Sequence, residues 1–354
     1  MDPAVRIEPF GTTDAGEAVD AVVLTNATGM LVRILTFGAT IQSVIVPDRE
    51  GNLADVTLGY PTAEGYCADP HYFGATIGRV ANRIAGGRFA IDGQAIQVSC
   101  NDGANSLHGG GEGFDKRCWS LVETRGGDRP GVTLRLVSPD GDQGYPGTLA
   151  VTAEFVLEPD NRLTINYQAM TDRVTMVNLT NHAYWNLQGE GSPGNALGHL
   201  LEIPAKAFLA TDAGSIPTGE FVPVRGSPFD FRSARPILDG INARHPQIEV
   251  GHGYDHNWVL QPASGLRLAA RLHDPKSGRV LEVRTDKPGV QFYSGNFLGG
   301  FLAGKSGRPY HPGDGVAIEP QDFPDSPNHP EFASIRLDPG QTYCHQIEFA
   351  FAVV

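Results

Sequence analysis

Alternation of apolar and polar residues is the feature of this sequence that most restricts its fold. The run at 149–157, LAVTAEFVL, has an apolar residue at every second position, and the run at 162–170, RLTINYQAM, repeats the pattern. Shorter runs at 131–137, at 280–286 and at the C-terminus alternate in the same way. A period of two with one polar side is typical of antiparallel strands buried on one face. The chain is therefore predicted to be built mainly of antiparallel β-sheet.

Turn signals separate the alternating runs, which favours many short strands over long helices. The chain contains 44 glycines and 26 prolines, and these are dispersed among apolar residues rather than repeated. A helix is suggested only at 233–242, where Pro236 and Gly240 interrupt it. No repeat or linker marks a domain boundary. The prediction is a single all-β domain over 1–354, a large sandwich of antiparallel sheets. The clearest turn signals are PDREGN at 47–52, IDGQ at 91–94, EPDN at 158–161 and DPKSG at 274–278.

Composition excludes several classes of partner. The net charge is −13, from 27 basic and 40 acidic residues, and no dense basic cluster suits a nucleic acid or an anionic membrane. No apolar run approaches the ~18 residues of a membrane span, and the N-terminus lacks the pattern of a signal peptide. Four scattered cysteines do not form a disulfide framework or a zinc motif. We expect a cytoplasmic protein with an uncharged substrate, in which the glycosylation sequons at Asn26 and Asn178 go unused.

The segment 174–187, VTMVNLTNHAYWNL, carries an unusual set of polar residues. If it is read as a strand, one face is uncharged, aromatic and rich in hydrogen-bonding groups. Such a face suits a sugar, whose hydroxyl groups need donors and acceptors and whose C–H faces pack on rings. A polar outer face without function is the alternative interpretation. The residues on this face are Asn178, Thr180, His182, Tyr184 and Asn186.

A carboxylate follows the apolar positions of another predicted strand. In VAIEP the strand is predicted to end on Glu319, which lies opposite Val316 and Ile318. Four prolines between 317 and 330 restrict the loop that follows, and so restrict where this strand end points. In GVQFYSG, Gln291 is likewise a polar residue on the side away from its apolar neighbours. A glutamate at a strand end is commonly a solvated surface group, and that alternative stays open.

Three loops add polar candidates. Residues 78–89 contain Asn82 and Arg83, and residues 104–114 place His108 before three glycines. The glycines do not connect a strand to a helix, so close approach of the backbone to a ligand is favoured over a phosphate site. The third loop, GHGYDHNW at 251–258, contains Asp255 between His252 and His256. Histidines four residues apart bind metal on a helix, but the neighbouring glycines make a helix here improbable.

Six ordered motifs together resemble the aldose 1-epimerase family, also called galactose mutarotases. The resemblance covers the chain from about residue 37 to the C-terminal strand. The motifs are FGATIGRVANRIAGGRF, NSLHGG, NLTNHAYWNL, GYDHNW, PGVQFYSGNFL and AIEPQDFPDSPNHPEF.

The resemblance implies a fold, an activity and a site. The fold would be a β-supersandwich with an open sugar-binding cleft on one concave sheet, in a protein that is usually a monomer. The activity would be the interconversion of α and β anomers of a free hexose such as galactose or glucose, without metal or cofactor. The family's catalytic base falls on Glu319 and its acid on His182, while Tyr184 is expected to line the cleft. The sugar-holding residues fall on Asn82, Arg83, His108, Asp255 and Gln291.

Anomer exchange requires a base at the C1 hydroxyl and an acid at the ring oxygen. A carboxylate such as Glu319 is available at neutral pH, whereas His182 acts as an acid only if it is protonated. We therefore hypothesise that a nearby carboxylate raises the pKa of His182.

Three other functions fit parts of the pattern. In a glycosidase, Asp255 and Glu319 would be the two carboxyl groups that flank a glycosidic bond, and His182 would not be needed. A hexose-6-phosphate epimerase requires extra basic residues near the cleft, and only Arg79, Arg83 and Arg88 are candidates. A non-catalytic sugar-binding module needs no proton-transfer pair, so the presence of both Glu319 and His182 argues against it.

Overall fold

The structure, a computed structural model, describes residues 2–300 and 302–354. Within these ranges regular structure is almost entirely strand, and helices are limited to short turns between strands. None of these helices is long and apolar enough to cross a membrane. The α-helices are α1 (Ala63–Ala68), α2 (Ile237–Ile241) and α3 (Pro246–Gly251), and the 3-10 turns are η1 (Ala85–Gly87), η2 (Phe114–Lys116), η3 (Asp142–Gly144), η4 (Ala196–Gly198) and η5 (Ser326–Asn328).

The largest sheet is antiparallel and has nine strands in the described residues. It contains the alternating runs from which sheet was predicted, including 149–157 and 162–170, and there the prediction is confirmed. The apolar side chains of these two runs are buried: Phe155 pairs with Ile165 across the two strands, and both are fully covered. In sheet order the strands are β11 (Ser120–Arg125), β12 (Gly131–Ser138), β13 (Leu149–Leu157), β14 (Arg162–Thr171), β28 (Tyr343–Val353), β24 (Arg279–Thr285), β23 (Arg267–His273), β18 (Leu200–Glu202) and β21 (Arg235–Pro236).

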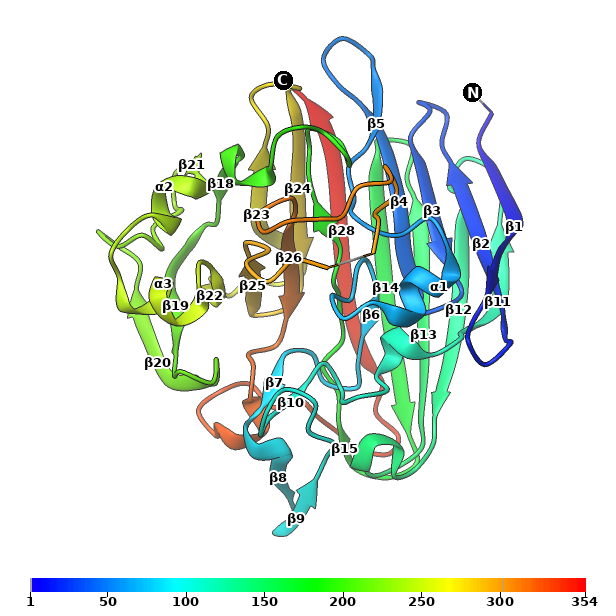
Figure 1. The fold of residues 1–354 in the computed structure, drawn as a ribbon. Coiled ribbons are helices and arrows are strands. Elements are labelled where there is room, and N and C mark those ends of the chain that lie inside the picture. Colours follow the sequence, from blue (N-terminus) through cyan, green and yellow to red (C-terminus); the bar gives the residue numbers. More distant parts are fainter. Residues whose placement is uncertain (1, 301) are drawn as a thin grey trace.

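A five-stranded sheet from the N-terminal part of the chain lies across β11–β14 (Figure 1). Its apolar face and that of the nine-stranded sheet meet in one core cluster, which includes Ile34 and Phe155. Burial of two apolar sheet faces against each other is the main stabilising term of a sandwich. The predicted all-β sandwich is therefore confirmed. The strands of the smaller sheet are β1 (Ala4–Thr12), β2 (Ala18–Thr25), β3 (Leu31–Leu35), β4 (Thr40–Pro47) and β5 (Leu53–Asp55).

A six-stranded sheet carries four of the eight predicted site residues, Tyr184, Asp255, Gln291 and Glu319. Its strands lie in the order β17 (Tyr184–Trp185), β26 (Val316–Gln321), β25 (Gly289–Tyr293), β22 (Asp255–Leu260), β19 (Ala205–Thr211) and β20 (Pro217–Pro223). One face packs into the core through Trp258 and Phe292, which are fully buried. Four two-stranded ladders complete the described sheets: β6 (Thr76–Ile77) with β16 (Thr180–Asn181), β7 (Arg83–Ile84) with β10 (Ser106–Leu107), β8 (Arg88–Ile91) with β9 (Gln94–Gln97), and β15 (Thr175–Met176) with β27 (Arg336–Leu337).

The segment 174–187 is not one strand, so that interpretation was wrong. It consists of three two-residue strands, β15, β16 and β17, and each pairs with a different partner. The segment passes from ladder to ladder, and its polar residues therefore do not share a single face.

The predicted end of the strand at Glu319 was also wrong, because β26 continues through Pro320 to Gln321. A proline is tolerated in a strand where its missing N–H has no partner to lose. The neighbour on that edge, β17, pairs only with Val316 and Ala317. The predicted helix at 233–242 is present as the shorter α2, which begins directly after Pro236.

Candidate active site

A pocket of about 140 Å³ opens at the six-stranded sheet and gathers residues from segments far apart in the sequence. Strands β22, β25 and β26 contribute one wall, and the loops around residues 71, 82 and 108 contribute the other. Seven of the eight residues predicted from sequence line it; the eighth, Gln291, is not among the lining residues but donates to Asp255, which is. The lining residues are Pro70, His71, Tyr72, Asn82, Arg83, Leu107, His108, His182, Tyr184, Asp255, Tyr293, Phe297 and Glu319.

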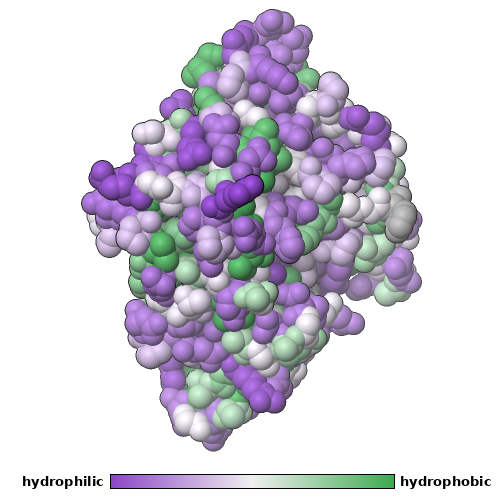
Figure 2. Space-filling view, turned by 60° about the vertical axis from the view of Figure 1, so that its left-hand side comes forward, coloured by the Kyte–Doolittle hydropathy of each residue, from purple (hydrophilic) through white to green (hydrophobic). Residues whose placement is uncertain are grey.

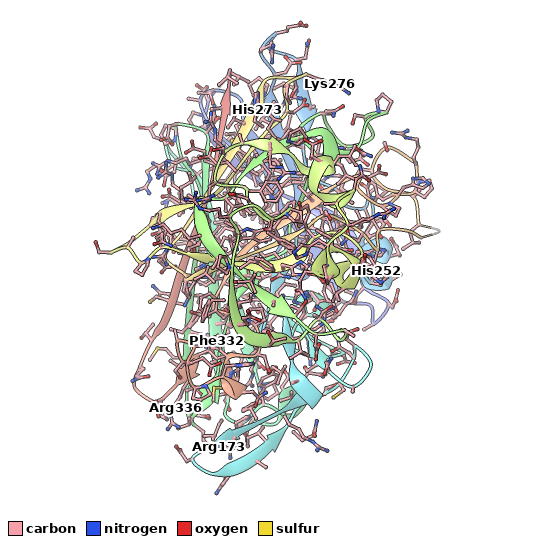
Figure 3. The ribbon with its side chains drawn as sticks, turned by 90° about the vertical axis from the view of Figure 1, so that its left-hand side faces the viewer. Arg173, His252, His273, Lys276, Phe332 and Arg336 are labelled. Atoms are coloured by element: carbon pink, nitrogen blue, oxygen red, sulfur yellow. The ribbon has the colours of Figure 1, made fainter. Side chains whose placement is uncertain are left out.

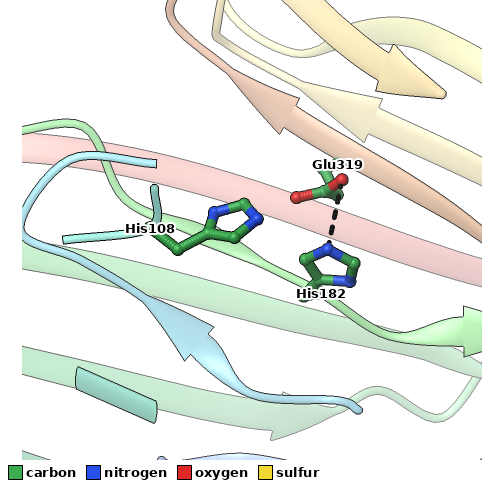
Figure 4. Close-up of side chains that lie close together, drawn as sticks. All are labelled: His108, His182 and Glu319. Atoms are coloured by element: carbon green, nitrogen blue, oxygen red, sulfur yellow. Dashed lines mark ion pairs between the residues drawn. The ribbon is translucent and has the colours of Figure 1, made fainter. Parts of the chain in front are cut away.

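Glu319 and His182 face each other in this pocket (Figure 4). The distance from His182 Nε2 to Glu319 Oε1 is 3.6 Å, and both side chains are almost completely buried. His182 Nδ1 and Glu319 Oε2 have no hydrogen-bond partner among the described residues. A change of protonation at Glu319 Oε2 or His182 Nδ1 therefore breaks no hydrogen bond to another described residue.

Burial shifts the pKa values of the two groups in opposite directions. It raises the pKa of Glu319 well above its ordinary value; the negative charge of Asp255 adds to this, and Arg83 opposes it. Burial lowers the pKa of His182 to about 4, although Asp255 acts in the other direction. The hypothesis that a carboxylate raises the pKa of His182 was therefore wrong, because loss of solvent outweighs attraction to the carboxylate. Both shifts favour a neutral pair, with the proton on the carboxyl group.

His108 is held in one tautomer by the backbone of the neighbouring loop. The backbone N–H of Asn82 donates to the ring nitrogen Nδ1 of His108 at 3.1 Å, and the backbone N–H of His108 donates to the backbone carbonyl of Asn82 at 3.0 Å. Burial, with His182 and Arg83, lowers the pKa of His108 well below its usual range, so the ring is neutral. A neutral imidazole that accepts at Nδ1 carries its hydrogen on Nε2. His108 is therefore a donor on the side of His182, to which its ring lies edge-on at 5.2 Å.

Arg83, Asp255 and Gln291 form a connected polar network. Arg83 Nε donates to Asp102 Oδ2 at 2.7 Å, and its Nη1 lies 3.5 Å from Asp255 Oδ2. The other oxygen of Asp255 accepts from Gln291 Nε2 at 2.7 Å. Gln291 thus holds one carboxylate oxygen of Asp255, while Asp255 and Arg83 present a charged acceptor and a charged donor to the pocket.

Aromatic rings form much of the rest of the wall, and of these only Tyr184 was predicted from the sequence. Tyr184 stacks on His182 with ring centroids 4.9 Å apart. Tyr72 contacts both histidines, with centroids 4.7 Å from His108 and 5.9 Å from His182. Tyr72 was missed, and its left-handed backbone (φ 61°) has no signal in the sequence. Tyr293 was also missed, although its position two residues after Gln291, on the same face of β25, could have indicated it.

The polar residues of 174–187 divide into two groups. His182 and Tyr184 line the pocket, as the sugar-binding interpretation requires. The other three bind backbone groups instead: Asn178 binds Asp322, Thr180 binds the carbonyl of Pro320, and Asn186 binds the carbonyl of Asp314. The prediction of one five-residue sugar-binding face was therefore wrong for Asn178, Thr180 and Asn186.

The two histidines of GHGYDHNW do not converge. His252 follows the end of α3, is exposed and lies toward the edge of the molecule in Figure 3, whereas His256 is fully buried. A different trio could hold a metal ion: His108, His182 and Glu319 each offer a ligand atom, all within 4.8 Å of one another. Ligand atoms around tetrahedral zinc lie about 3.3 Å apart, so this trio would have to contract.

Comparisons with known proteins agree on one family. A family model described as aldose 1-epimerase matches residues 20–350. The chain is 46% identical to a galactose mutarotase of Bos taurus over 91% of each chain, and 41% identical to an aldose 1-epimerase of Escherichia coli over 95% of this chain and 96% of that one. Among solved structures, a galactose 1-epimerase from Lactobacillus acidophilus superposes with a TM-score of 0.87 at 27% identity, covering 99% of each chain. An aldose epimerase homologue from C. elegans gives 0.86 at 30% identity, covering 99% of this chain and 100% of that one.

Proposed function

The chain belongs to the aldose 1-epimerase family and is an isomerase of the mutarotase type, and we propose that it acts on free aldohexoses such as galactose and glucose through Glu319 and His182. One observation supports this assignment most directly. A buried carboxyl group and a buried imidazole, 3.6 Å apart, share a small pocket whose other polar groups suit a sugar.

The reaction moves two protons and breaks one ring bond. Glu319, as carboxylate, takes the proton of the C1 hydroxyl, and His182, as imidazolium, gives a proton to the ring oxygen as the C1–O5 bond breaks. The resulting aldehyde rotates about C1–C2, and closure on its other face reverses both proton transfers. Each group contributes about 10²- to 10⁴-fold to the rate.

The productive protonation state of the pair is not the one that burial favours. A carboxylate with an imidazolium contains the same number of protons as a carboxylic acid with a neutral imidazole. Because burial raises the pKa of Glu319 and lowers the pKa of His182, the free site favours the neutral pair. We infer that hydroxyl groups of the bound sugar, which supply hydrogen bonds to both groups, shift the pair toward its charged form.

The remaining residues hold the sugar. Asp255 accepts from hydroxyl groups, Arg83 and the Nε2–H of His108 donate to oxygens, and Tyr184 packs on a C–H face. Asn82 contributes through its backbone, which fixes the tautomer of His108. Gln291 acts through Asp255, whose carboxylate it holds.

The arrangement of basic residues supports an unphosphorylated substrate. Of the three arginines considered from sequence, only Arg83 lines the pocket. The guanidinium of Arg79 is buried and donates to the carbonyls of Ser138, Pro139 and Pro146. Arg88 is exposed and donates to Gln97.

We also propose that the protein acts as a cytoplasmic monomer in which residues 1–354 form one domain. The pocket is complete within one chain, and the four cysteines Cys67, Cys100, Cys118 and Cys344 are unpaired, as is usual in a reducing compartment. Size-exclusion chromatography with light scattering distinguishes the monomer from a dimer.

Substrate choice tests the proposed function. Optical rotation should approach equilibrium faster with the protein for α-galactose and α-glucose, and more slowly or not at all for galactose 6-phosphate. A methyl galactoside, whose C1 oxygen has no proton to lose, should stay unchanged. Hydrolysis of nitrophenyl galactoside without acceleration of galactose mutarotation would instead identify a glycosidase.

A further inference from the structure

The segment Asn178-Leu179-Thr180 has the sequence of a glycosylation sequon, but its side chains are used inside the protein. Both Asn178 and Thr180 are fully buried, so neither is available to a glycosylating enzyme in the folded chain. Their side chains do not line the pocket; they donate to backbone carbonyl groups of the segment that follows Glu319. Their contribution to the site is therefore indirect.

The strand that carries Glu319 lacks a neighbouring strand on one edge at that point. On one side β25 pairs with β26 along its length, from Gly289 with Gln321 to Tyr293 with Ala317. On the other side β17 pairs only with the first two residues of β26. Beyond Ala317 that edge has no strand within the described residues, and its polar backbone groups need other partners.

Asn178 and Thr180 supply these partners. Thr180 Oγ1 donates to the carbonyl of Pro320 at 2.7 Å. Asn178 Nδ2 donates to the carbonyl of Asp322 at 3.1 Å, and its Oδ1 accepts from the N–H of Asp322 at 3.0 Å. Two side chains thus make the contacts that a continued β17 would have made, immediately after Glu319.

A second chain of contacts connects the same two segments. The carboxylate of Asp322 lies 3.0 Å from Lys287 Nζ, which itself lies 4.3 Å from the ring centre of Tyr343. Tyr343 Oη accepts from the N–H of Leu179 at 3.0 Å. This series of contacts therefore ends at Leu179, between Asn178 and Thr180, and connects that segment to the residue that follows β26.

The backbone must position Glu319, because its side chain has few contacts that could do so. Its closest ionic partner, His182 Nε2, is 3.6 Å away, and Oε2 has no hydrogen-bond partner in the described residues. A displacement of about 1 Å at a reacting group can reduce a rate about 10²-fold.

We propose that Asn178 and Thr180 are positioning residues that hold β26 so that Glu319 points at the sugar. This inference rests on the proposed function, in which Glu319 is the base. It assigns to the buried sequon a role in catalysis that requires no contact with substrate.

Replacement of Thr180 tests the proposal. Thr180→Val keeps the shape and removes the hydroxyl, whereas Thr180→Ser keeps the hydroxyl. We expect Thr180→Val to lower kcat for galactose about 10-fold or more with little change in KM, and Thr180→Ser to restore most of it. The alkaline limb of the kcat/KM profile, which reports ionisation of Glu319, should move to lower pH in Thr180→Val, because a displaced carboxyl group gains solvent. Thr164→Val, at another buried threonine with its side chain in the nine-stranded sheet, is the matched control and should leave kcat unchanged.

Two further variants separate the possible outcomes. Asn178→Asp keeps the acceptor for the N–H of Asp322 and loses the donor to its carbonyl, so it should also lower kcat if it folds. The proposal is overturned if Thr180→Val keeps the wild-type kcat and pH limb, or if Thr180→Ser is as slow as Thr180→Val. Glu319→Gln is measured in parallel: if it keeps the wild-type rate, the proposed base has failed, whatever Thr180→Val does.

Discussion

Replacement of Glu319 by glutamine should slow the enzyme and stabilise its fold. The carboxyl group is 2% exposed, and one of its oxygens has no hydrogen-bond partner in the described part of the chain. Above its unfolded pKa, a carboxyl group whose pKa is raised by burial destabilises the fold by about 1.4 kcal/mol for each pH unit by which that pKa is raised. Glutamine has nearly the same shape but no charge. At pH 8 we therefore expect Glu319→Gln to unfold with a free energy about 1–3 kcal/mol higher than that of the wild type.

The pH dependence of this gain follows from the direction of the pKa shift. The pKa of Glu319 is higher in the folded than in the unfolded chain, so the wild type is not penalised below the unfolded value of about 4.3. Its stability falls as the pH rises from there through the folded pKa, because the unfolded chain releases the proton that the buried carboxyl group retains. The advantage of Glu319→Gln should thus be small near pH 4.5 and largest near pH 8.

Urea unfolding, followed by tryptophan fluorescence at both pH values, measures this difference. Glu123→Gln, at an exposed glutamate of β11, is the matched control and should change the free energy of unfolding by less than about 0.5 kcal/mol at either pH. A destabilised Glu319→Gln, or a gain of equal size at pH 4.5 and pH 8, would refute the reasoning.

Three further variants test the electrostatics and the sugar contacts. Asp255→Asn should move the alkaline limb of kcat/KM to lower pH, because the charge of Asp255 raises the pKa of Glu319, and loss of the last proton from the pair is ionisation of Glu319. An unmoved limb in a pH series of initial rates would contradict this. Arg83→Lys should raise KM about 10-fold, because lysine cannot reproduce the contacts to both Asp102 and Asp255. Arg88→Lys, at an exposed arginine, is the control and should leave KM unchanged. Equal effects of the two variants in galactose saturation curves would count against a role for Arg83 in binding. Gln291→Met should raise KM several-fold, because it removes the hydrogen bond that holds the carboxylate of Asp255. Isothermal titration with galactose checks the loss of affinity, and a loss confined to kcat would be inconsistent.

Periodicity predicted the sheets well where a strand keeps one neighbour on each side. Strands β13 and β14 pair along their full lengths and bury every second side chain, so local alternation reflects their tertiary environment. It failed at 174–187, where the chain changes partner every few residues and no single face exists. The same limit applies at β26, where Pro320 is accommodated because the adjacent strand has ended.

Sequence patterns predicted the two reactive residues of the site, Glu319 and His182, better than they predicted the rest of it. Alternation along the predicted strands separated His182, Gln291 and Glu319 from their apolar neighbours. The expectation that these three residues converge on one cleft came from the family resemblance. Figure 2 shows a molecular face dominated by hydrophilic residues, so polarity alone does not mark a site. Tyr72 enters through an unusual backbone conformation, and the depressed pKa of His182 depends on burial contributed by many segments. Neither property can be obtained from local patterns.

The most direct test is a comparison of wild type and Glu319→Gln with the same sugar. Freshly dissolved α-galactose is followed by optical rotation with each protein and with none, while calorimetry measures galactose binding to both. We predict that Glu319→Gln still binds galactose but catalyses mutarotation about 10²- to 10⁴-fold more slowly than the wild type. A Glu319→Gln variant that accelerates mutarotation as well as the wild type does would contradict the assignment of Glu319 as the base.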